Sequence, residues 1–303
     1  SPFIFEYHTI ASIDIDDNGH TDFLIGGSLS NTEFNTNRVL SNNGDGTFNM
    51  ISAPSIIPGG YLGYYQSGYL DNSEKKHLVV AGNSGGQTFG YVLENQGNGN
   101  FVQAYDLGAN LNSNFPTIEI IDINNDGLND ISVVSGTGTR IYKNLGNLDF
   151  QLFDNTGLPS IYKGVVKYAD IDGDGLLDAL GFGDFHNPRT YSGKIYFQSS
   201  VPNNNQLGSL QFGDVHQIMI PAFEFPDINP GIPINTHYAD VDFYDVNNDG
   251  QMDILVCGNY GSLPFYNPNT FLLTNTTTLS FGNFKHKQIL MYPNPAKNKV
   301  MFS

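Results

Sequence analysis

Basic residues and cysteine are both scarce in this chain of 303 residues. It contains 13 Lys and Arg against 30 Asp and Glu, which gives a formal charge of −17. A negative field of this size argues against nucleic acid or an anionic membrane surface as a partner. The one cysteine, Cys257, ends an apolar run and is best explained as a small core residue. A single cysteine excludes a disulfide within the chain, so cysteine usage does not decide whether the protein is exported.

Long apolar runs are also missing. No stretch of about 18 apolar residues is present, so no membrane span is predicted. Charged residues make up only 14% of the chain, whereas glycine, with 34 residues, and tyrosine, with 17, are frequent. This composition is typical of turn-rich β-proteins.

A nine-residue pattern occurs four times, starting at Asp14, Asp122, Asp170 and Asp245. Oxygen-bearing side chains stand at positions 1, 3, 5 and 9, glycine stands at position 6, and an apolar run follows directly. Calcium takes about six to eight oxygen ligands at flexible angles, and glycine permits the sharp turn. The alternative is a solvated acidic turn, because Asp, Asn and Gly are ordinary turn formers. Four copies in one register favour calcium, since crowded carboxylates repel one another unless a cation lies between them.

The predicted ligands are the side chains at positions 1, 3, 5 and 9 and the main-chain carbonyl at position 7. They are Asp14, Asp16, Asn18, His20 and Asp22; Asp122, Asn124, Asp126, Leu128 and Asp130; Asp170, Asp172, Asp174, Leu176 and Asp178; and Asp245, Asn247, Asp249, Gln251 and Asp253.

An EF-hand is the obvious rival, and the sequence argues against it. That loop needs a bidentate Glu at position 12 and flanking helices. Position 12 here is Ile25, Val133, Gly181 or Val256. The flanking segments are short apolar runs, which are typical of buried strands. The loops are therefore predicted to join strands.

A second signature follows each loop: an apolar pair, a polar Asn/Gly turn and then Phe. Asn-Gly and related turns between apolar runs predict hairpins. The copies end at Phe48, Phe101 and Phe150, with looser copies at Phe212 and Phe281.

The copy at Phe101 reveals a fifth unit whose own loop, residues 69–77, has lost the pattern. Its positions 1, 6 and 9 are Tyr69, Glu74 and His77. We expect no metal in this loop, and we expect Lys75 and Lys76 partly to replace the missing positive charge.

The five units recur at about 50 residues, a period that indicates β-propeller blades. The two signatures in this order resemble the FG-GAP/VCBS repeat family, whose calcium-loop blades occur in the integrin α-subunit head; the resemblance covers about residues 3–284. It implies an all-β propeller of four-stranded blades in which the loops link the first two strands. Such propellers usually have seven blades. With five visible, the chain is either part of a longer propeller or an unusual five-bladed ring.

The predicted domains are a propeller over residues 1–285 and a tail over 286–303. The blades span about 1–57, 58–110, 111–158, 159–222 and 223–285. In the tail, Tyr292-Pro-Asn-Pro-Ala296 resembles the start of the C-terminal sorting domain of type IX secretion cargo in Bacteroidota-type bacteria. This implies a linker with the truncated start of that domain, export through that machinery, and a secreted or cell-surface location. A proline-rich linker alone is the alternative.

No catalytic constellation is found. Gly82-Asn-Ser84-Gly-Gly86 fits G-x-S-x-G, but it lies between two strand-like runs, whereas a nucleophile elbow leads into a helix. The seven histidines show no zinc spacing. The sequence therefore predicts a protein that is not an enzyme.

Two segments are candidates for recognition. One is the tyrosine-rich stretch 61–69, for which blade packing is the alternative, and the other is the long insertion 213–239, for which a passive loop is the alternative. We expect a secreted β-propeller with up to four structural Ca²⁺ ions that acts as a cell-surface binding or adhesion module for glycan or protein ligands. The alternatives are a polysaccharide-active enzyme of the lyase type and a structural subunit of a larger surface or secretion complex.

Overall fold

All secondary structure in the described part of the chain is β-strand. The computed structural model describes residues 6–28, 37–58, 63–84, 86–108, 111, 116–153, 156–158, 160–171, 173–186, 189–198, 212–218, 237–260, 267–274 and 290–293. The predicted all-β class is confirmed for these residues. None of them belongs to a helix able to cross a membrane.

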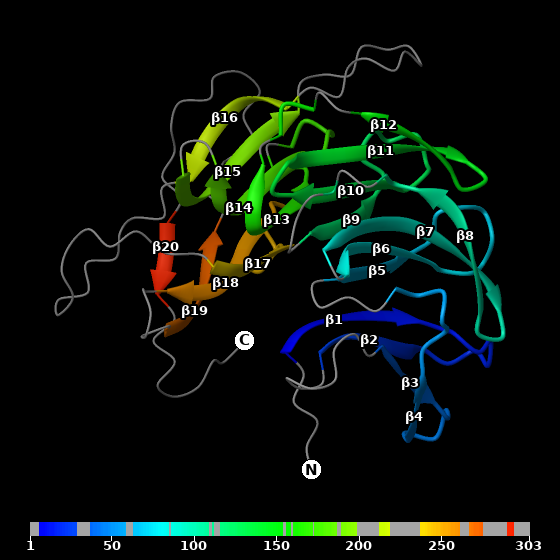
Figure 1. The fold of residues 1–303 in the computed structure, drawn as a ribbon. Coiled ribbons are helices and arrows are strands. Elements are labelled where there is room, and N and C mark those ends of the chain that lie inside the picture. The colour runs from blue at the N-terminus through cyan, green and yellow to red at the C-terminus, as the bar shows by residue number, and fades with distance from the viewer. Residues whose placement is uncertain are drawn as a thin grey trace. The chain divides into compact units, whose positions relative to one another are not determined.

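The strands form five antiparallel sheets of four strands, each with its strands in chain order (Figure 1). The first contains β1 (Glu6–Ile13), β2 (Asp22–Ser28), β3 (Arg38–Asn42) and β4 (Phe48–Ser52), and the second β5 (Tyr64–Gly68), β6 (His77–Ser84), β7 (Gln87–Gly97) and β8 (Asn100–Asp106). The third contains β9 (Thr117–Ile121), β10 (Asp130–Ser135), β11 (Gly138–Gly146) and β12 (Asp149–Phe153). The fourth contains β13 (Ile161–Ala169), β14 (Asp178–His186), β15 (Arg189–Gln198) and β16 (Phe212–Ile218), and the fifth β17 (His237–Tyr244), β18 (Asp253–Tyr260), β19 (Asn267–Thr274) and β20 (Leu290–Pro293).

The chain divides into two compact units, Ser1–Tyr162 and Lys163–Ser303. In the second unit, β20 pairs with β19. Part of the segment 286–303, predicted as a tail, thus forms the fourth strand of the fifth sheet. Phe281, residues 294–296 of the proposed sorting motif and most of the 213–239 insertion lie outside the described residues.

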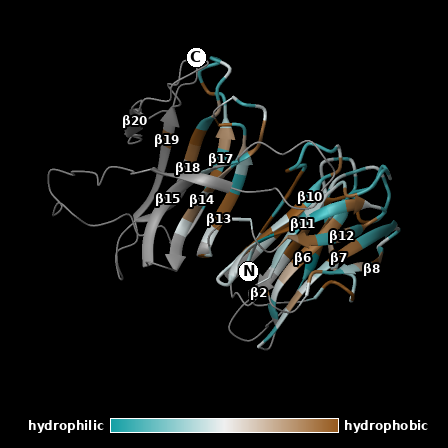
Figure 2. Ribbon diagram, turned by 90° about the horizontal axis from the view of Figure 1, so that it is seen from above, coloured by the Kyte–Doolittle hydropathy of each residue, from teal (hydrophilic) through white to brown (hydrophobic). Residues whose placement is uncertain are grey.

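Two hydrophobic layers hold the three sheets of the first unit together. The apolar run of β6 supplies both layers, because successive side chains of a strand point to opposite faces. Strands of this unit carry most of its hydrophobic residues, and the connecting loops are largely hydrophilic (Figure 2). The layer between the first and second sheets includes Ile13, Leu24, Leu78, Val80 and Leu93, and the layer between the second and third includes Val79, Ala81, Val92, Ile131 and Val133.

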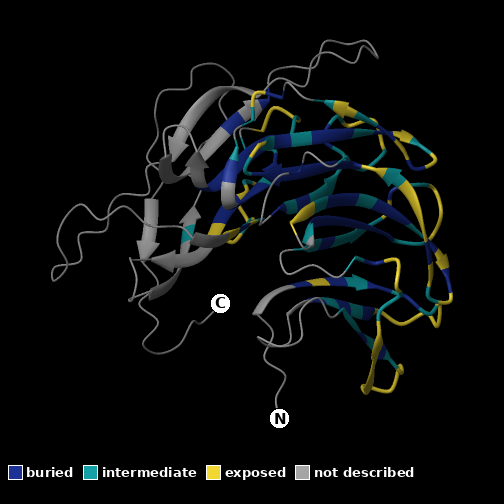
Figure 3. Cartoon of the chain, in the orientation of Figure 1, coloured by how far each residue is buried: buried dark blue, intermediate teal, exposed yellow. Residues whose placement is uncertain are grey.

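The Phe that ends the second signature packs against the preceding sheet. Phe101 lies in the layer with the first sheet and Phe150 in the layer with the second. Their side chains are 6% and 4% exposed, whereas Phe48 is 43% exposed and all of β4 is exposed (Figure 3). Phe101 and Phe150 are therefore buried through contact with the sheet that precedes them in the first unit.

Within the tyrosine-rich stretch, Tyr65 is a core residue. It is fully buried, and its hydroxyl donates to the Pro58 carbonyl at 2.6 Å. Burial raises the pKa of this phenol. The packing interpretation is thus confirmed for Tyr65, whereas Tyr69 is half exposed and Tyr61 lies outside the described residues.

The G-x-S-x-G segment lies in a hairpin, as expected. Ser84 ends β6 and pairs with Gln87, the first residue of β7. A second strand, and not a helix, follows this serine.

Truncating Leu93 tests the first hydrophobic layer. Leu93→Ala should lower the free energy of unfolding by about 2–5 kcal/mol, because it leaves a cavity between two sheets. Urea unfolding followed by circular dichroism measures this change. Met50→Ala on the exposed β4 is the control and should change stability by less than about 0.5 kcal/mol. Equal effects of the two substitutions would contradict the proposed layer.

Candidate metal-binding loops

Each acidic loop connects the first two strands of a sheet. Residues 14–22 join β1 to β2, residues 122–130 join β9 to β10, residues 170–178 join β13 to β14, and residues 245–253 join β17 to β18. The loops thus stand where the repeat resemblance implied.

The backbone of all four loops follows the same left-handed pattern at positions 4 and 6. Position 4 has φ of 63° at Asp17, 57° at Asn125, 80° at Gly173 and 56° at Asn248. Position 6 is glycine, with φ between 82° at Gly19 and 88° at Gly127. Asp, Asn and Gly are the residues that tolerate this conformation best. Position 4 was not singled out from the sequence, although its restriction to these three residue types was the available signal.

The side chain at position 1 holds the turn closed. Its carboxylate accepts a hydrogen bond from the N–H of the glycine at position 6 in every loop, at 2.8–3.0 Å. The oxygen at position 5 accepts from the N–H of position 7, at 2.8–3.1 Å. These bonds turn the side chains at positions 1 and 5 back toward the backbone of their own loop.

The carboxylate at position 9 is fully buried and anchors the loop to the sheet. One oxygen of Asp22 accepts from the N–H of Ile15 at 2.8 Å, and the other accepts from the N–H of Asn42 on β3 at 2.8 Å. The same pair of bonds is made by Asp130 with Ile123 and Asn144, and by Asp178 with Ile171 and Gln198. In the fifth sheet, Asp253 accepts from Val246 at 3.0 Å. Position 9, predicted only as a ligand, therefore also has a structural role that the sequence analysis missed.

The Asn of the second signature links neighbouring sheets in the first unit. Its Oδ1 accepts from the glycine N–H two residues later, at 2.9 Å in both Asn95 and Asn144. Its Nδ2 reaches the loop of the preceding sheet, where Asn95 donates to the Asp14 carbonyl at 3.2 Å and Asn144 to the Leu70 carbonyl at 2.8 Å. The loops are thus part of the contact between sheets.

Among the described residues, the 14–22 loop brings three carboxylates close together. Carboxylate oxygens of Asp14, Asp16 and Asp22 lie within 4.8 Å of one another. Asp14 Oδ1 is buried and has no hydrogen-bond partner in the structure. A buried acceptor without a donor is costly, and a hard divalent cation would satisfy it.

The other loops also gather acidic groups. Burial raises the pKa of Asp130 to about 7, and the charges of Asp126 and Asp122 act in the same direction. Hydrogen bonds from Asn144 and Ile123 oppose the shift. Asp172 of the 170–178 loop lies outside the described residues, so that ligand set is not fully described.

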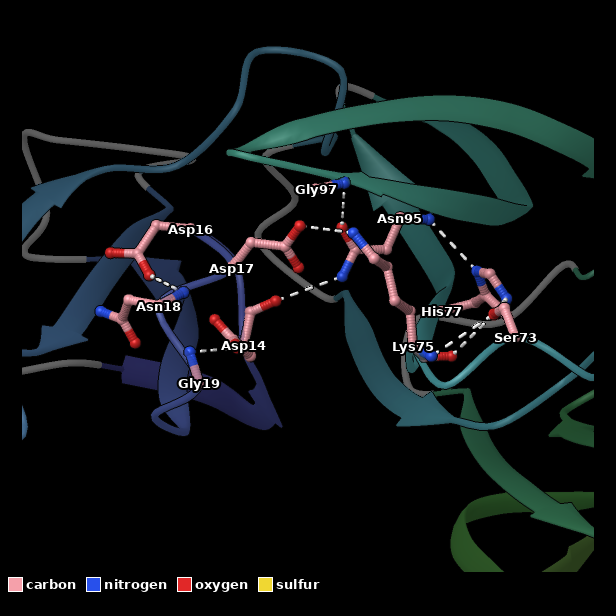
Figure 4. A network of polar contacts seen from close by, with 10 residues as sticks. All are labelled: Asp14, Asp16, Asp17, Asn18, Gly19, Ser73, Lys75, His77, Asn95 and Gly97. Atoms are coloured by element: carbon pink, nitrogen blue, oxygen red, sulfur yellow. Dashed lines mark hydrogen bonds and ion pairs between the residues drawn. The ribbon is translucent and has the colours of Figure 1, made fainter.

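The 69–77 loop uses a histidine where the others use a carboxylate (Figure 4). Nδ1 of the buried His77 accepts from the N–H of Asn95 at 3.2 Å, the bond that Asp22 and Asp130 make in their sheets. Nε2 must then carry the hydrogen, and it lies 2.9 Å from Asp71 Oδ1 and 3.3 Å from Ser73 Oγ. Burial acts to raise the pKa of Asp71, but hydrogen bonds from Ser73 and His77 outweigh it and lower that pKa.

The expected charge compensation by two lysines needs correction. Lys75 pairs with Asp17 in the loop of the preceding sheet (Figure 4). Lys76 lies over the Tyr69 ring, with Nζ 5.9 Å from the ring centroid. Within the 69–77 loop, Asp71 is contacted by His77 and by the N–H of Ser73. The partner of a lysine is difficult to predict from the sequence, because its side chain is long and flexible. Here Lys75 reaches the preceding loop and Lys76 reaches the Tyr69 ring.

Comparison with known proteins supports repeats of this kind. Residues 122–181 match the family described as FG-GAP-like repeat. A solved structure of a lectin from Agrocybe aegerita, described as recognising non-reducing terminal N-acetylglucosamine, matches with a TM-score of 0.50 and 15% sequence identity. The match covers 89% of this chain but 63% of the lectin chain, and at this identity it shows similarity of fold alone. No curated protein sequence matches significantly.

Removing the His77 side chain tests its anchoring role. His77→Ala should destabilise the fold by about 1–3 kcal/mol, because the buried Asn95 N–H and Asp71 both lose a partner. Thermal and urea unfolding should show the loss equally with Ca²⁺ and with EDTA. Lys76→Ala in the same loop is the control and should have little effect. A loss that calcium abolishes would contradict this assignment.

Proposed function

We propose that this protein is a secreted, calcium-stabilised β-propeller that serves as a binding or adhesion module for glycan or protein ligands at a cell surface. The observation that carries the proposal is the repetition of one loop geometry in four sheets, together with the unpartnered buried oxygen of Asp14. The FG-GAP-like match within residues 122–181 supports it.

Up to four Ca²⁺ ions would be held by the side chains at positions 1, 3, 5 and 9 and the carbonyl at position 7 of the acidic loops. The ion would neutralise the acidic groups and fix the corner between the first two strands. Because the loops also bond to neighbouring sheets in the first unit, their order supports the contact between blades. We therefore propose that calcium stabilises the fold and does not act as a conformational switch.

The stacked sheets support the propeller. In the first unit, successive four-stranded sheets pack face to face through layers drawn from alternate residues. Repeated packing of this kind is typical of propeller blades. Five blades are proposed here, either as a ring of five or within a longer propeller.

The binding role is supported by the likeness in fold to a lectin. The hairpin position of Ser84 speaks against a nucleophile elbow, and we therefore favour binding over catalysis. A lyase-type enzyme acting on polysaccharides and a structural subunit of a surface complex remain the rival functions. The resemblance of residues 292–296 to a sorting motif supports export through type IX secretion machinery.

Calcium removal tests the structural role of the loops. EDTA should lower the melting temperature, and added Ca²⁺ should restore it, because an ion at about ten times its Kd stabilises the folded state by about 1.4 kcal/mol per site. Differential scanning fluorimetry measures both shifts. An unchanged melting curve would contradict the calcium assignment.

A calcium titration of two variants tests which loops bind the ions. Asp170→Ala combined with Asp174→Ala should remove one bound ion in a calcium titration. Tyr69→Ala, at position 1 of the 69–77 loop, should remove none.

A glycan-binding assay separates the functional alternatives. We expect the protein to bind glycans on an array, with terminal N-acetylglucosamine among the probes, and to release no product. New reducing ends or unsaturated products from plant or algal polysaccharides would instead support the enzyme. Tyr69→Ala should weaken glycan binding, whereas Phe48→Ala, which removes a similarly exposed aromatic residue on β4, should not. Absence of glycan and protein binding would contradict the binding role.

A further inference from the structure

Two acidic loops pair with a lysine, but in only one of these pairs is the carboxylate a predicted calcium ligand. Lys75 pairs with Asp17 at position 4 of the 14–22 loop, which is not a predicted ligand. Lys143 on β11 places its Nζ 3.0 Å from Oδ2 of Asp126, the residue at position 5 of the 122–130 loop. The Lys143 and Asp126 side chains are only 23% and 30% exposed, so water screens this pair less than it screens a fully exposed pair.

Lys143 occupies a defined place in the repeat. It directly precedes Asn144, whose N–H bonds to the position-9 carboxylate of the same loop. The equivalent residue in the first sheet is Ser41, which precedes Asn42 in the same pairing register. The Ser41 hydroxyl donates to Asp16 Oδ2 at 3.0 Å. Both side chains thus reach into the acidic loop, one with a neutral donor and one with a full charge.

Among the five sheets, only the third has a lysine at the position of Lys143. In the fourth sheet, Ala179 follows the acidic loop and pairs with Tyr196, so the next residue, Phe197, is equivalent to Lys143. In the fifth sheet, Ile254 follows the loop and pairs with Leu273, so Thr274 is the equivalent residue. In the second sheet the equivalent is Glu94, beside the loop that uses His77. Among the four acidic loops, only the 122–130 loop faces a lysine at this position.

We propose that Lys143 is an internal competitor for calcium that makes the 122–130 loop the weaker site and the 14–22 loop the stronger one. The ammonium group neutralises part of the acidic cluster and repels a divalent ion placed among the same carboxylates. The 122–130 loop then keeps its shape at calcium concentrations that leave it empty, whereas the 14–22 loop depends on the ion. This inference rests on the calcium part of the proposed function.

Exchanging the two residues tests the proposal. In isothermal titration with CaCl₂, Lys143→Ser should tighten binding at the 122–130 loop by about tenfold, as expected when a unit charge a few ångström from a divalent ion is removed in a water-like dielectric. Ser41→Lys should weaken binding at the 14–22 loop by a similar factor. Lys76→Ser, which removes a lysine from the 69–77 loop, is the charge-matched control and should change neither site.

A loop-specific background assigns the effect. With Asp122→Asn and Asp126→Asn present, Lys143→Ser should no longer change calcium affinity. Calcium binding by the wild type with no change in Lys143→Ser would overturn the proposal alone. Failure of the wild type and of Lys143→Ser to bind calcium would overturn the calcium assignment and the proposal together.

Discussion

One buried acceptor in each repeat holds the local structure together. It is the side chain at position 9 of the strand-connecting loop, and in the first, third and fourth sheets it accepts one N–H from its own loop and one from the third strand. An unsatisfied buried N–H costs about 1–3 kcal/mol, so both donors need this acceptor. The loop conformation, the start of the second strand and the register of the third strand therefore depend on the same group.

This constraint explains how a loop can lose the acidic pattern without loss of the sheet. His77 keeps the bond to the third strand through Nδ1 and turns an N–H toward Asp71. An imidazole supplies both an acceptor and a donor, whereas a carboxylate supplies acceptors alone. The second repeat thus obtains within the chain a hydrogen-bond donor for its acidic residue, whereas the other loops are proposed to take a cation from solution. Lys143 represents an intermediate arrangement, in which an acidic loop has gained a cation and kept its carboxylates.

Much of the fold could be predicted from the sequence. The regular spacing of acidic residues around one glycine predicted the loops, and the short apolar runs after them predicted the strands. Both patterns could be recognised because they are local in the sequence. The difference in exposure between Phe48 and the buried Phe101 and Phe150 could not be predicted, since it depends on contacts with other sheets. The role of Asp22 as an anchor was missed for a similar reason. Its partner Asn42 lies 20 residues away and is identified only by the strand register.

Crystals of the protein grown in CaCl₂ would show whether calcium occupies the acidic loops and is absent from the 69–77 loop, because anomalous scattering can locate each ion. We expect an ion in the 14–22 loop, coordinated by Asp14, Asp16 and Asp22, and a hydrogen bond between His77 and Asp71 in an ion-free 69–77 loop. An ion in the 69–77 loop, or none in the 14–22 loop at millimolar calcium, would contradict this expectation.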